Sequence, residues 1–487
     1  MLSVFSIGVG IVVLAIFAID QRRGALAYLA AALLTPTVAF EGFSFRIEHV
    51  LPLPMLFVAT LPGRVSALKW WSGSLAKSYA IWWLWVMIVS AASYSDGVNN
   101  TASWSDAYSL FRPMVIMAVF YVAFKPANGN EAASPEAMRK VLRLFVLASI
   151  PLGLLAVAQV LNYGPARTAT GELYGSFSRT AIAVQTARVA GGYVWRAVSV
   201  FENVGYAATY FVMAVGAGVM MIMFGRKNSP LSSRLLTLCA TIAAFVGGVF
   251  TMSATFWAGL ALVAVIAGLH FRRGNWFRSA LWAVVILTLV VSVGYALLEE
   301  GGNLTTTTQY MILTKVLGGQ GLAVRYGGLD SSEAIFSAID SAMQRPIVGW
   351  GVSRPVGVVV NDSLYVYLLH SGGIIGILLF AAFAYQYVAL SQRCVPEVKA
   401  ITRMWFAVIL ICGLGGITIF IPRLCDCWWG FSGVMAGLAT RRKTRARFAS
   451  TNQRLVLRPR GFGGSEESVA GTLGCLPPRT GGSRNIQ

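Results

Sequence analysis

The chain has 487 residues, of which 56% are hydrophobic and only 12% are charged, and its formal net charge at pH 7 is +20. An ordinary soluble domain carries about 25% charged residues, so this composition excludes a soluble globular protein. Because only helices and closed barrels satisfy the backbone inside a bilayer, the long unbroken apolar runs favour helices. The sequence therefore predicts an all-α polytopic membrane protein.

Apolar runs that suit a transmembrane helix recur about 12 to 13 times within residues 1–440. The third run is the weakest, because it is short and contains Pro52 and Pro54. In chain order the expected spans are Leu2–Ile19, Ala25–Phe40, Val50–Pro62, Tyr79–Ala92, Leu110–Phe124, Val141–Leu161, Val204–Phe224, Leu235–Phe250, Ala254–His270, Ser279–Leu298, Ser363–Leu390, Ile401–Ile421 and Trp428–Leu438.

Basic residues gather in alternate loops, from Arg22 and Arg23 to the tail after Arg441. Such loops are typical of the cytoplasmic side, so we expect the N-terminus outside and the C-terminus inside. The same pattern accounts for the net charge, because the basic residues are spread over many loops without a nucleic-acid-binding motif. Residues 441–487, rich in Gly, Ser and Arg, are expected to form a basic, disordered cytoplasmic tail.

Two long loops are expected on the outer side, at about residues 162–203 and 299–362. Seven of their eight cations are arginines, on the side where basic residues should be depleted. The planar guanidinium group binds phosphate oxygens in a bidentate manner, which predicts an anionic phosphate ligand. Pairing with acidic residues of the same loops is the alternative for any single arginine. The eight cations are Arg167, Arg179, Arg188, Arg196, Lys315, Arg325, Arg345 and Arg354.

The segment Gly349–Gly376 leads from the second long loop into an apolar helix. Asn361, Asp362 and Ser363 precede that helix, and these residue types are preferred N-caps. A capping role and a role at an outer cavity are both compatible with this position. His370 follows Asp362 by eight residues, on the same helix face and about 12 Å deeper. An intramembrane histidine is a functional candidate, and a packed, hydrogen-bonded residue is the alternative.

Together these residues resemble the superfamily of O-antigen ligases and O-antigen or exopolysaccharide polymerases. A second likeness lies upstream, where Arg196 stands in WRAVSVFENVGYAA. The two regions and the number of spans extend the resemblance over most of the chain to about residue 440. The signature region reads here as Arg325, then SSEAIFSAIDSAMQRPIVGWG ending at Gly351, then Asp362 and Ser363, then Gly373–Gly376.

Two elements depart from the family pattern. Asp362 and Ser363 stand where many ligases carry His-Asn, and an acidic residue there favours a polymerase. Residues 251–253 are similar to the family's Thr-x-Ser-Arg element, but Ala254 replaces the arginine.

The resemblance implies a glycosyltransferase that polymerises lipid-linked oligosaccharide repeat units at the outer face of a bacterial inner membrane. The donor would be an undecaprenyl-diphosphate-linked oligosaccharide, and transfer would be inverting and independent of metals. No metal and no cofactor are expected. The expected partners are the lipid-linked substrate, the lipid bilayer and other polysaccharide assembly proteins, and no nucleic acid.

For such a transfer, Asp362 is the first candidate for the general base and Glu202 the second. Arg196 and Arg325 would stabilise the departing diphosphate, and Arg354 and His370 would be supporting contacts. Two alternatives remain open. One is a ligase that moves finished glycan onto another acceptor. The other is a lipid-linked oligosaccharide flippase or permease, a class that usually shows internal repeats and broken helices, although no clear internal repeat is present here.

Overall fold

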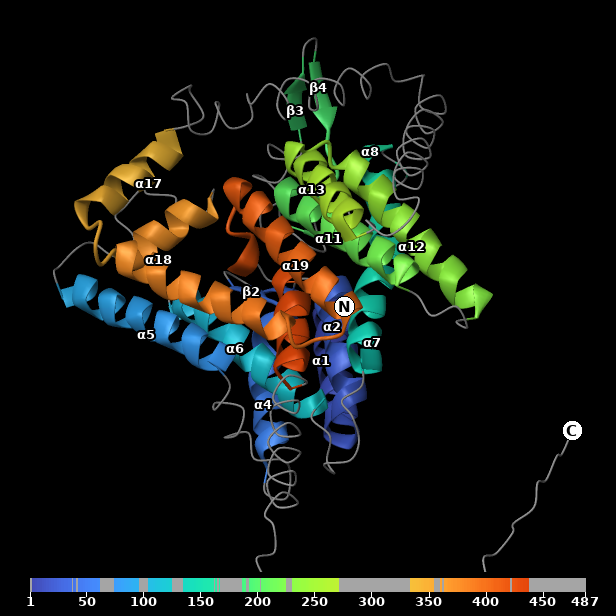
Figure 1. Cartoon of the computed structure of the whole chain (residues 1–487), viewed down its shortest axis with the longest axis horizontal. Helices are drawn as coiled ribbons and strands as arrows, with labels where there is room; N and C mark the ends of the chain where they lie inside the picture. The colour runs from blue at the N-terminus through green and yellow to red at the C-terminus, as the bar shows by residue number, and fades with distance from the viewer. Residues whose placement is uncertain are drawn as a thin grey trace, which may run out of the picture. The chain divides into compact units, whose positions relative to one another are not determined.

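The computed structural model describes residues 2–36, 38–40, 43–61, 74–95, 104–124, 135–161, 163, 166, 186–189, 192–201, 203–224, 230–270, 333–353, 360, 363–420 and 423–437. The chain divides into two compact units, Met1–Arg442 and Lys443–Gln487, and all described residues belong to the first. Within these residues the chain is helical apart from two short hairpins. Figure 1 shows the arrangement of the elements.

Seven helices of the described part are long and apolar enough to cross a membrane. Three shorter apolar helices accompany them, at Phe5–Ile19, Ile47–Thr60 and Ala254–Gly268. The predicted class is therefore confirmed at the level of a multi-pass helical membrane protein in a lipid bilayer. The seven helices are Leu75–Tyr94, Asp106–Phe124, Met138–Val160, Val204–Met223, Leu231–Phe250, Leu364–Ser391 and Pro396–Gly415.

The first half of the chain contains the described elements that precede α11. Its helices are α1 (Leu2–Ile19), α2 (Gln21–Leu34), α3 (Ile47–Val50), α4 (Pro52–Thr60), α5 (Ser74–Ser95), α6 (Trp104–Phe124), α7 (Pro135–Leu147) and α8 (Ser149–Val160). Its antiparallel hairpins are β1 (Val38–Phe40) with β2 (Phe43–Phe45), paired Val38 to Phe45, and β3 (Thr186–Val189) with β4 (Gly192–Trp195), paired Thr186 to Trp195.

The elements of the second half include the break that shapes the candidate site. The helices are α11 (Val204–Met223), α12 (Leu231–Phe250), α13 (Ala254–His270), α17 (Glu333–Gln344), α18 (Leu364–Ser391) and α19 (Pro396–Cys412). Two single turns follow, η4 (Gly413–Gly415) and η5 (Thr418–Phe420), and residues 424–437 form a last helix.

Several element boundaries differ from those expected. The Asp20 side chain accepts from the amides of Arg22 and Arg23 and so starts α2 earlier than the expected span. This helix stops at Leu34, before Thr35 and Pro36, because a residue that precedes proline avoids helical backbone angles. The expected span Ser279–Leu298 lies outside the described residues.

The apolar segment Met138–Val160, which corresponds to the expected span Val141–Leu161, is divided at Ala148 into α7 and α8. Pro151 stands in the first turn of α8. Proline has no amide hydrogen, so it cannot continue the hydrogen bonds of the preceding helix.

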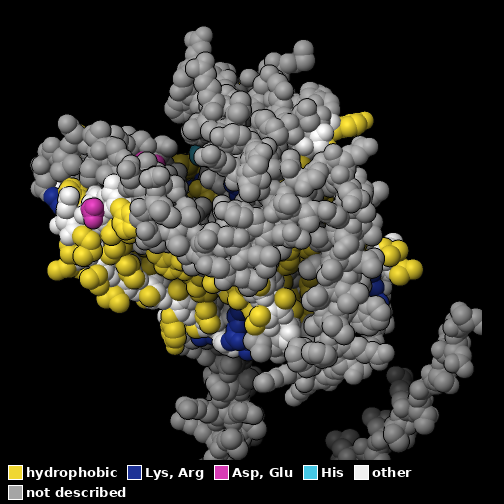
Figure 2. All heavy atoms as spheres, turned by 90° about the horizontal axis from the view of Figure 1, so that it is seen from above, with side chains coloured by type: hydrophobic (Ala, Val, Ile, Leu, Met, Phe, Trp, Pro, Cys, Tyr) yellow, Lys and Arg dark blue, Asp and Glu magenta, His cyan; other side chains and the backbone are white. Residues whose placement is uncertain are grey.

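Close packing of helices places the two halves side by side. In Figure 1, α5 runs along α18, and α11 contacts α12, α13 and α19. Small residues permit this approach: a Cβ atom on Gly153 would lie 2.4 Å from the carbonyl oxygen of Ala243. Exposed apolar side chains such as Ile88 and Leu378 suit contact with lipid. Figure 2 shows many more hydrophobic than charged side chains on the described part of one face.

Candidate functional site

The signature segment forms a backbone junction inside α18. This helix is interrupted at Gly373, whose angles are φ 60° and ψ −162°. The segment that follows α17 fills the interruption. The Trp350 amide donates to the His370 carbonyl at 2.7 Å, and the Ile374 amide donates to the Pro346 carbonyl at 2.8 Å. The turn before α18 therefore supplies hydrogen bonds that the broken helix cannot make within itself.

Only glycine fits at several positions of this junction, because a Cβ atom there would lie too close to neighbouring backbone atoms. A Cβ atom on Gly373 would lie 2.3 Å from the Ile347 carbonyl oxygen, and one on Gly349 would lie 2.6 Å from the Gly373 nitrogen. Gly351, at φ +75°, packs in the same way against Ser90 of α5. The glycine pattern of the signature segment thus has a structural role, since both close approach and positive φ exclude a side chain.

His370 lies at this junction and is packed rather than open. Its side chain is buried, and Nε2 is 3.3 Å from the Ser341 hydroxyl of α17. The Trp350 indole donates to the Ser341 carbonyl at 2.7 Å, and the Arg345 guanidinium lies 4.2 Å from the centre of the Trp350 ring. These contacts favour the packed, hydrogen-bonded interpretation of His370.

Four of the six predicted site residues lie outside the described residues, but the residues that follow two of them, Asp362 and Glu202, are described. Ser363, which follows Asp362, is the N-cap of α18, yet its hydroxyl makes no capping hydrogen bond. In α11 the side chain of Asn203, which follows Glu202, accepts from the Gly205 amide at 2.7 Å. The four residues outside the described part are Glu202, Arg325, Arg354 and Asp362.

The starts of α11 and α18 pack against the same turn, η4. A Cβ atom on Gly205 would lie 3.8 Å from the Gly415 carbonyl oxygen, and one on Gly413 would lie 3.0 Å from the Leu364 Cβ atom. The starts of α11 and α18 therefore both lie close to η4.

Arg196 lies at the corner between α12 and α13. Its Nε donates to the Thr251 carbonyl at 3.3 Å, and the next amide, of Ala197, donates to the Phe250 carbonyl at 3.0 Å. Ala254 stands at this corner, at the start of α13. A guanidinium group is thus present at the corner, although a different segment provides it.

Gln159 of α8 fixes the loop that follows Arg196. Its amide oxygen accepts from the backbone of Val198 at 3.1 Å and of Ser199 at 2.8 Å, and its nitrogen donates to the Ser199 carbonyl at 3.0 Å. Ser199 adopts φ 50° and its hydroxyl donates to the Leu152 carbonyl at 2.9 Å. These bonds hold a buried loop that has no regular structure.

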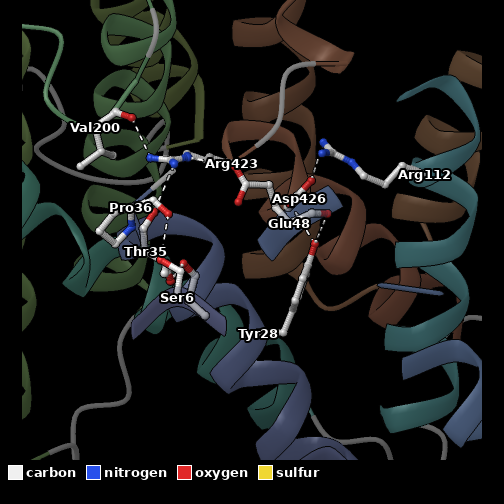
Figure 3. A network of polar contacts seen from close by, with 10 residues as sticks. Ser6, Tyr28, Thr35, Pro36, Glu48, Arg112, Val200, Arg423 and Asp426 are labelled. Atoms are coloured by element: carbon white, nitrogen blue, oxygen red, sulfur yellow. Dashed lines mark hydrogen bonds and ion pairs between the residues drawn. The ribbon is translucent and has the colours of Figure 1, made fainter. Parts of the chain in front are cut away.

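The same loop contacts a buried ionic network, shown in Figure 3. Arg423, which precedes the helix of residues 424–437, donates from Nη1 to the Val200 carbonyl at 2.8 Å and from Nη2 to the Thr35 carbonyl at 3.1 Å. Its Nε pairs with the Glu48 carboxylate at 3.0 Å. One arginine thereby joins the ends of α2, α3 and the Arg196 loop.

Asp426 forms the second centre of the network. It forms an ion pair with Arg112 Nη2 of α6 at 2.9 Å and accepts a hydrogen bond from the Tyr28 hydroxyl of α2 at 2.9 Å. Arg112 and Asp426 are both almost completely buried, with 2% and 0% of their surface exposed. Arg46 is buried beside them. Burial lowers its pKa to about 10 against the attraction of Glu48, so it stays charged at neutral pH.

Sequence reasoning missed this network, although one signal was present. Arg112 falls inside an expected span, and a charged residue within such a span marks a functional or paired position. Its partner Asp426 could not be identified from the sequence. Among the described residues, no group of three His, Cys, Asp or Glu side chains is placed to hold a metal ion.

No protein-family model matches this chain, and no curated protein matches it significantly. Function must therefore be inferred from the residues themselves.

Proposed function

We propose that this protein is a membrane glycosyltransferase that polymerises lipid-linked oligosaccharide repeat units into exopolysaccharide or O-antigen. The observation that supports this proposal is that the starts of α11 and α18 both lie close to η4, since in sequence Glu202 stands two residues before α11 and Asp362 two residues before α18. Transfer takes place at the outer face of a bacterial inner membrane, next to other polysaccharide assembly proteins. The donor is an undecaprenyl-diphosphate-linked oligosaccharide.

In the proposed chemistry a carboxylate acts as the general base, and guanidinium groups stabilise the leaving group. Asp362, or Glu202 in second place, removes the proton from the attacking sugar hydroxyl. Arg196 and Arg325 stabilise the negative charge that develops on the departing diphosphate, without a metal ion. Arg354 lies near the start of α18 in sequence and supports the same charge. His370 is assigned a packing role because of its contacts at the α18 junction.

The proposal includes a topology of 12 to 13 spans with the N-terminus outside and residues 441–487 as a cytoplasmic tail. The two long loops then face outward. The basic residues of the alternate loops support this orientation.

A flippase or permease is the second candidate, because α18 is broken within an apolar helix as transporter helices often are. In transporters such breaks usually leave backbone groups for an ion or substrate. Here the backbone of residues 346–351 fills the break with its own hydrogen bonds. The break thus supports a structural junction more than a transport site.

Glycans from cells that lack this protein test the proposed activity. Single lipid-linked repeats without long chains are expected for a polymerase, whereas full-length chains that remain on the carrier would identify a ligase. A flippase defect would leave the repeats on the cytoplasmic side, where added impermeant glycosidase cannot reach them in intact cells. Unchanged glycans would exclude all three activities.

The Asp362→Asn variant tests the assignment of the general base. We expect it to abolish polymer while the protein remains in the membrane at its normal level. Asp340→Asn is the matched control, because Asp340 is an exposed residue of α17. Normal polymer from the Asp362→Asn variant would remove Asp362 from the mechanism.

A further inference from the structure

Two cations of α19 lie on one face of the helix without a carboxylate partner. Lys399 and Arg403 are four residues apart, so they stand about one turn apart on the same face. Both residues are partly buried and keep part of their surface exposed. Among the described residues, no ion pair joins either side chain to a carboxylate. The Arg403 Nε atom also has no hydrogen-bond acceptor in this part of the chain.

The nearest carboxylate of α19 is bound to another helix. Glu397 is buried and accepts from Nε of Arg139 in α7 at 2.8 Å, and also from Nη2. The same two helices meet again at Trp405, whose ring centre lies 4.9 Å from that of Phe145. Arg403 follows Glu397 by six residues, which places it about 120° further round the helix. The face with the two cations is therefore not the face that contacts α7.

Beyond the cations the same face becomes apolar. Phe406 and Leu410 follow Arg403 at helical spacing, and both are partly buried. Phe406 packs against Tyr387 of α18, with ring centres 5.4 Å apart, where α18 and α19 are in contact (Figure 1). Arg403 stands seven residues after Pro396, the first residue of α19, which is about 10 Å along the helix axis. Charge near the start of the helix thus gives way to a hydrocarbon surface.

This order of chemistry along one face matches a phospholipid, in which a charged head group is followed by acyl chains. A charged side chain within an apolar helix is unfavourable unless it is paired or reaches the membrane interface. A zwitterionic head group carries its own cation next to the phosphate, and that cation competes with lysine and arginine. An anionic head group has no such cation, so it complements the charge of this face.

We propose that Lys399 and Arg403 bind the head group of an anionic phospholipid, whose acyl chains lie along Phe406 and Leu410 beside α18. The guanidinium donates two hydrogen bonds to phosphate oxygens, and the ammonium group supplies a second positive charge. Basic residues between transmembrane helices are a known form of anionic-lipid site. This inference does not rest on the proposed glycosyl transfer.

Lipid retention by the full-length protein tests the site. The protein is placed in nanodiscs of phosphatidylcholine that contain a minor fraction of phosphatidylglycerol, and native mass spectrometry measures which lipid stays bound after release. The Lys399→Gln/Arg403→Gln double variant removes both cations and keeps polar side chains. Arg22→Gln/Lys140→Gln is the matched control, because it removes two cations at exposed positions. Free glycerol 3-phosphate is added in a separate measurement.

We expect the wild-type protein to retain phosphatidylglycerol in preference to phosphatidylcholine. A cation near an anionic membrane surface contributes about fivefold in affinity, so the double variant should bind phosphatidylglycerol about thirtyfold more weakly. The matched control should bind it as the wild type does. Arg403→Lys should give an intermediate affinity, because it keeps the charge but loses the fork. Glycerol 3-phosphate should not displace the lipid, because it has no acyl chains.

Equal retention of the two lipids by the wild-type protein would overturn the proposal. So would unchanged retention of phosphatidylglycerol by the double variant, because Arg403 would then only extend to water. The unfolding temperature in pure phosphatidylcholine shows whether the double variant is folded, and if it is not, Arg403→Lys decides in its place. Displacement by glycerol 3-phosphate would replace the lipid site by a free-phosphate site. None of these measurements involves glycans, so the site stands even if the polymerase proposal fails.

Discussion

Arg423 shows how much depends on the shape of one side chain. Its guanidinium reaches a carboxylate and two carbonyls in three directions. Lysine has a single compact charge and cannot reproduce this fork. We expect Arg423→Lys to lower the free energy of unfolding by about 2 kcal/mol or more, as for lost hydrogen bonds to charged groups. Thermal unfolding in detergent measures the effect.

Arg22→Lys is the matched control for this change, because the Arg22 side chain is exposed. It should leave the unfolding temperature unchanged. If Arg423→Lys also left the unfolding temperature unchanged, the three contacts of Arg423 would contribute no net stability.

The identity of single site residues was only partly accessible from the sequence. The glycine pattern, His370 and Arg196 were recognised, but their partners were not. Arg196 contacts the Thr251 carbonyl, 55 residues further along the chain, and that contact depends on how two hairpins pack. Ser363 was a preferred capping residue by type, yet its buried hydroxyl makes no capping bond. A local preference was overruled there by the tertiary arrangement.

At the scale of elements, the glycines at the break in α18 cannot be replaced by a residue with a side chain without a steric clash. Gly373→Ala would force a Cβ atom to within 2.3 Å of the Ile347 carbonyl oxygen, and positive φ adds about 1–3 kcal/mol of strain. We expect poor membrane accumulation and a lower unfolding temperature, measured by fluorescence-detection size-exclusion chromatography before and after heating.

Gly8→Ala in α1 is the comparison for this variant, because a Cβ atom there would contact nothing within 4 Å. Alanine favours helix over glycine by up to about 1 kcal/mol, so this variant should be neutral or slightly more stable. Wild-type behaviour of Gly373→Ala would show that the junction can rearrange at little cost.

Gln159 of α8 holds the loop that follows Arg196 in place. Gln159→Leu would remove three hydrogen bonds to Val198 and Ser199, and buried unsatisfied backbone groups cost about 1–3 kcal/mol each. We expect faster hydrogen exchange in residues 196–201, with little change in α5 or α18. Gln392→Leu, at an exposed position, is the control. Unchanged exchange in the loop would mean that Gln159 does not hold it.

At the scale of the whole molecule, the orientation can be tested with cysteines. Tyr163, 80% exposed, lies at the start of the first long loop, and Arg22 lies in a predicted cytoplasmic turn. With Cys239, Cys394 and Cys475 replaced by serine, Tyr163→Cys should react with an impermeant maleimide in intact cells. Arg22→Cys should react only after permeabilisation. The opposite labelling pattern would reverse the proposed topology.

Composition and long apolar runs were sufficient to predict the class of the molecule, because a bilayer imposes simple rules on length and polarity. Helix ends were less predictable: α2 ends at a proline, and the break between α7 and α8 also involves a proline. The buried network was not predictable at all. Its members lie in separate apolar segments, and nothing in the local sequence of Glu48 indicates Arg423 as its partner.

The distance along the chain between these partners has a consequence for biogenesis. Glu48 and Arg423 are separated by 375 residues. Arg112 pairs with Asp426, which stands three residues after Arg423 in the sequence. During synthesis the early helices therefore enter the membrane while their counter-charges have yet to be translated. We expect a nascent chain that stops before Arg423 to be recognised as incomplete and degraded, even though most of its helices are present. Release of the helix of residues 424–437 from the ribosome would then be the step that commits the protein to its final assembly.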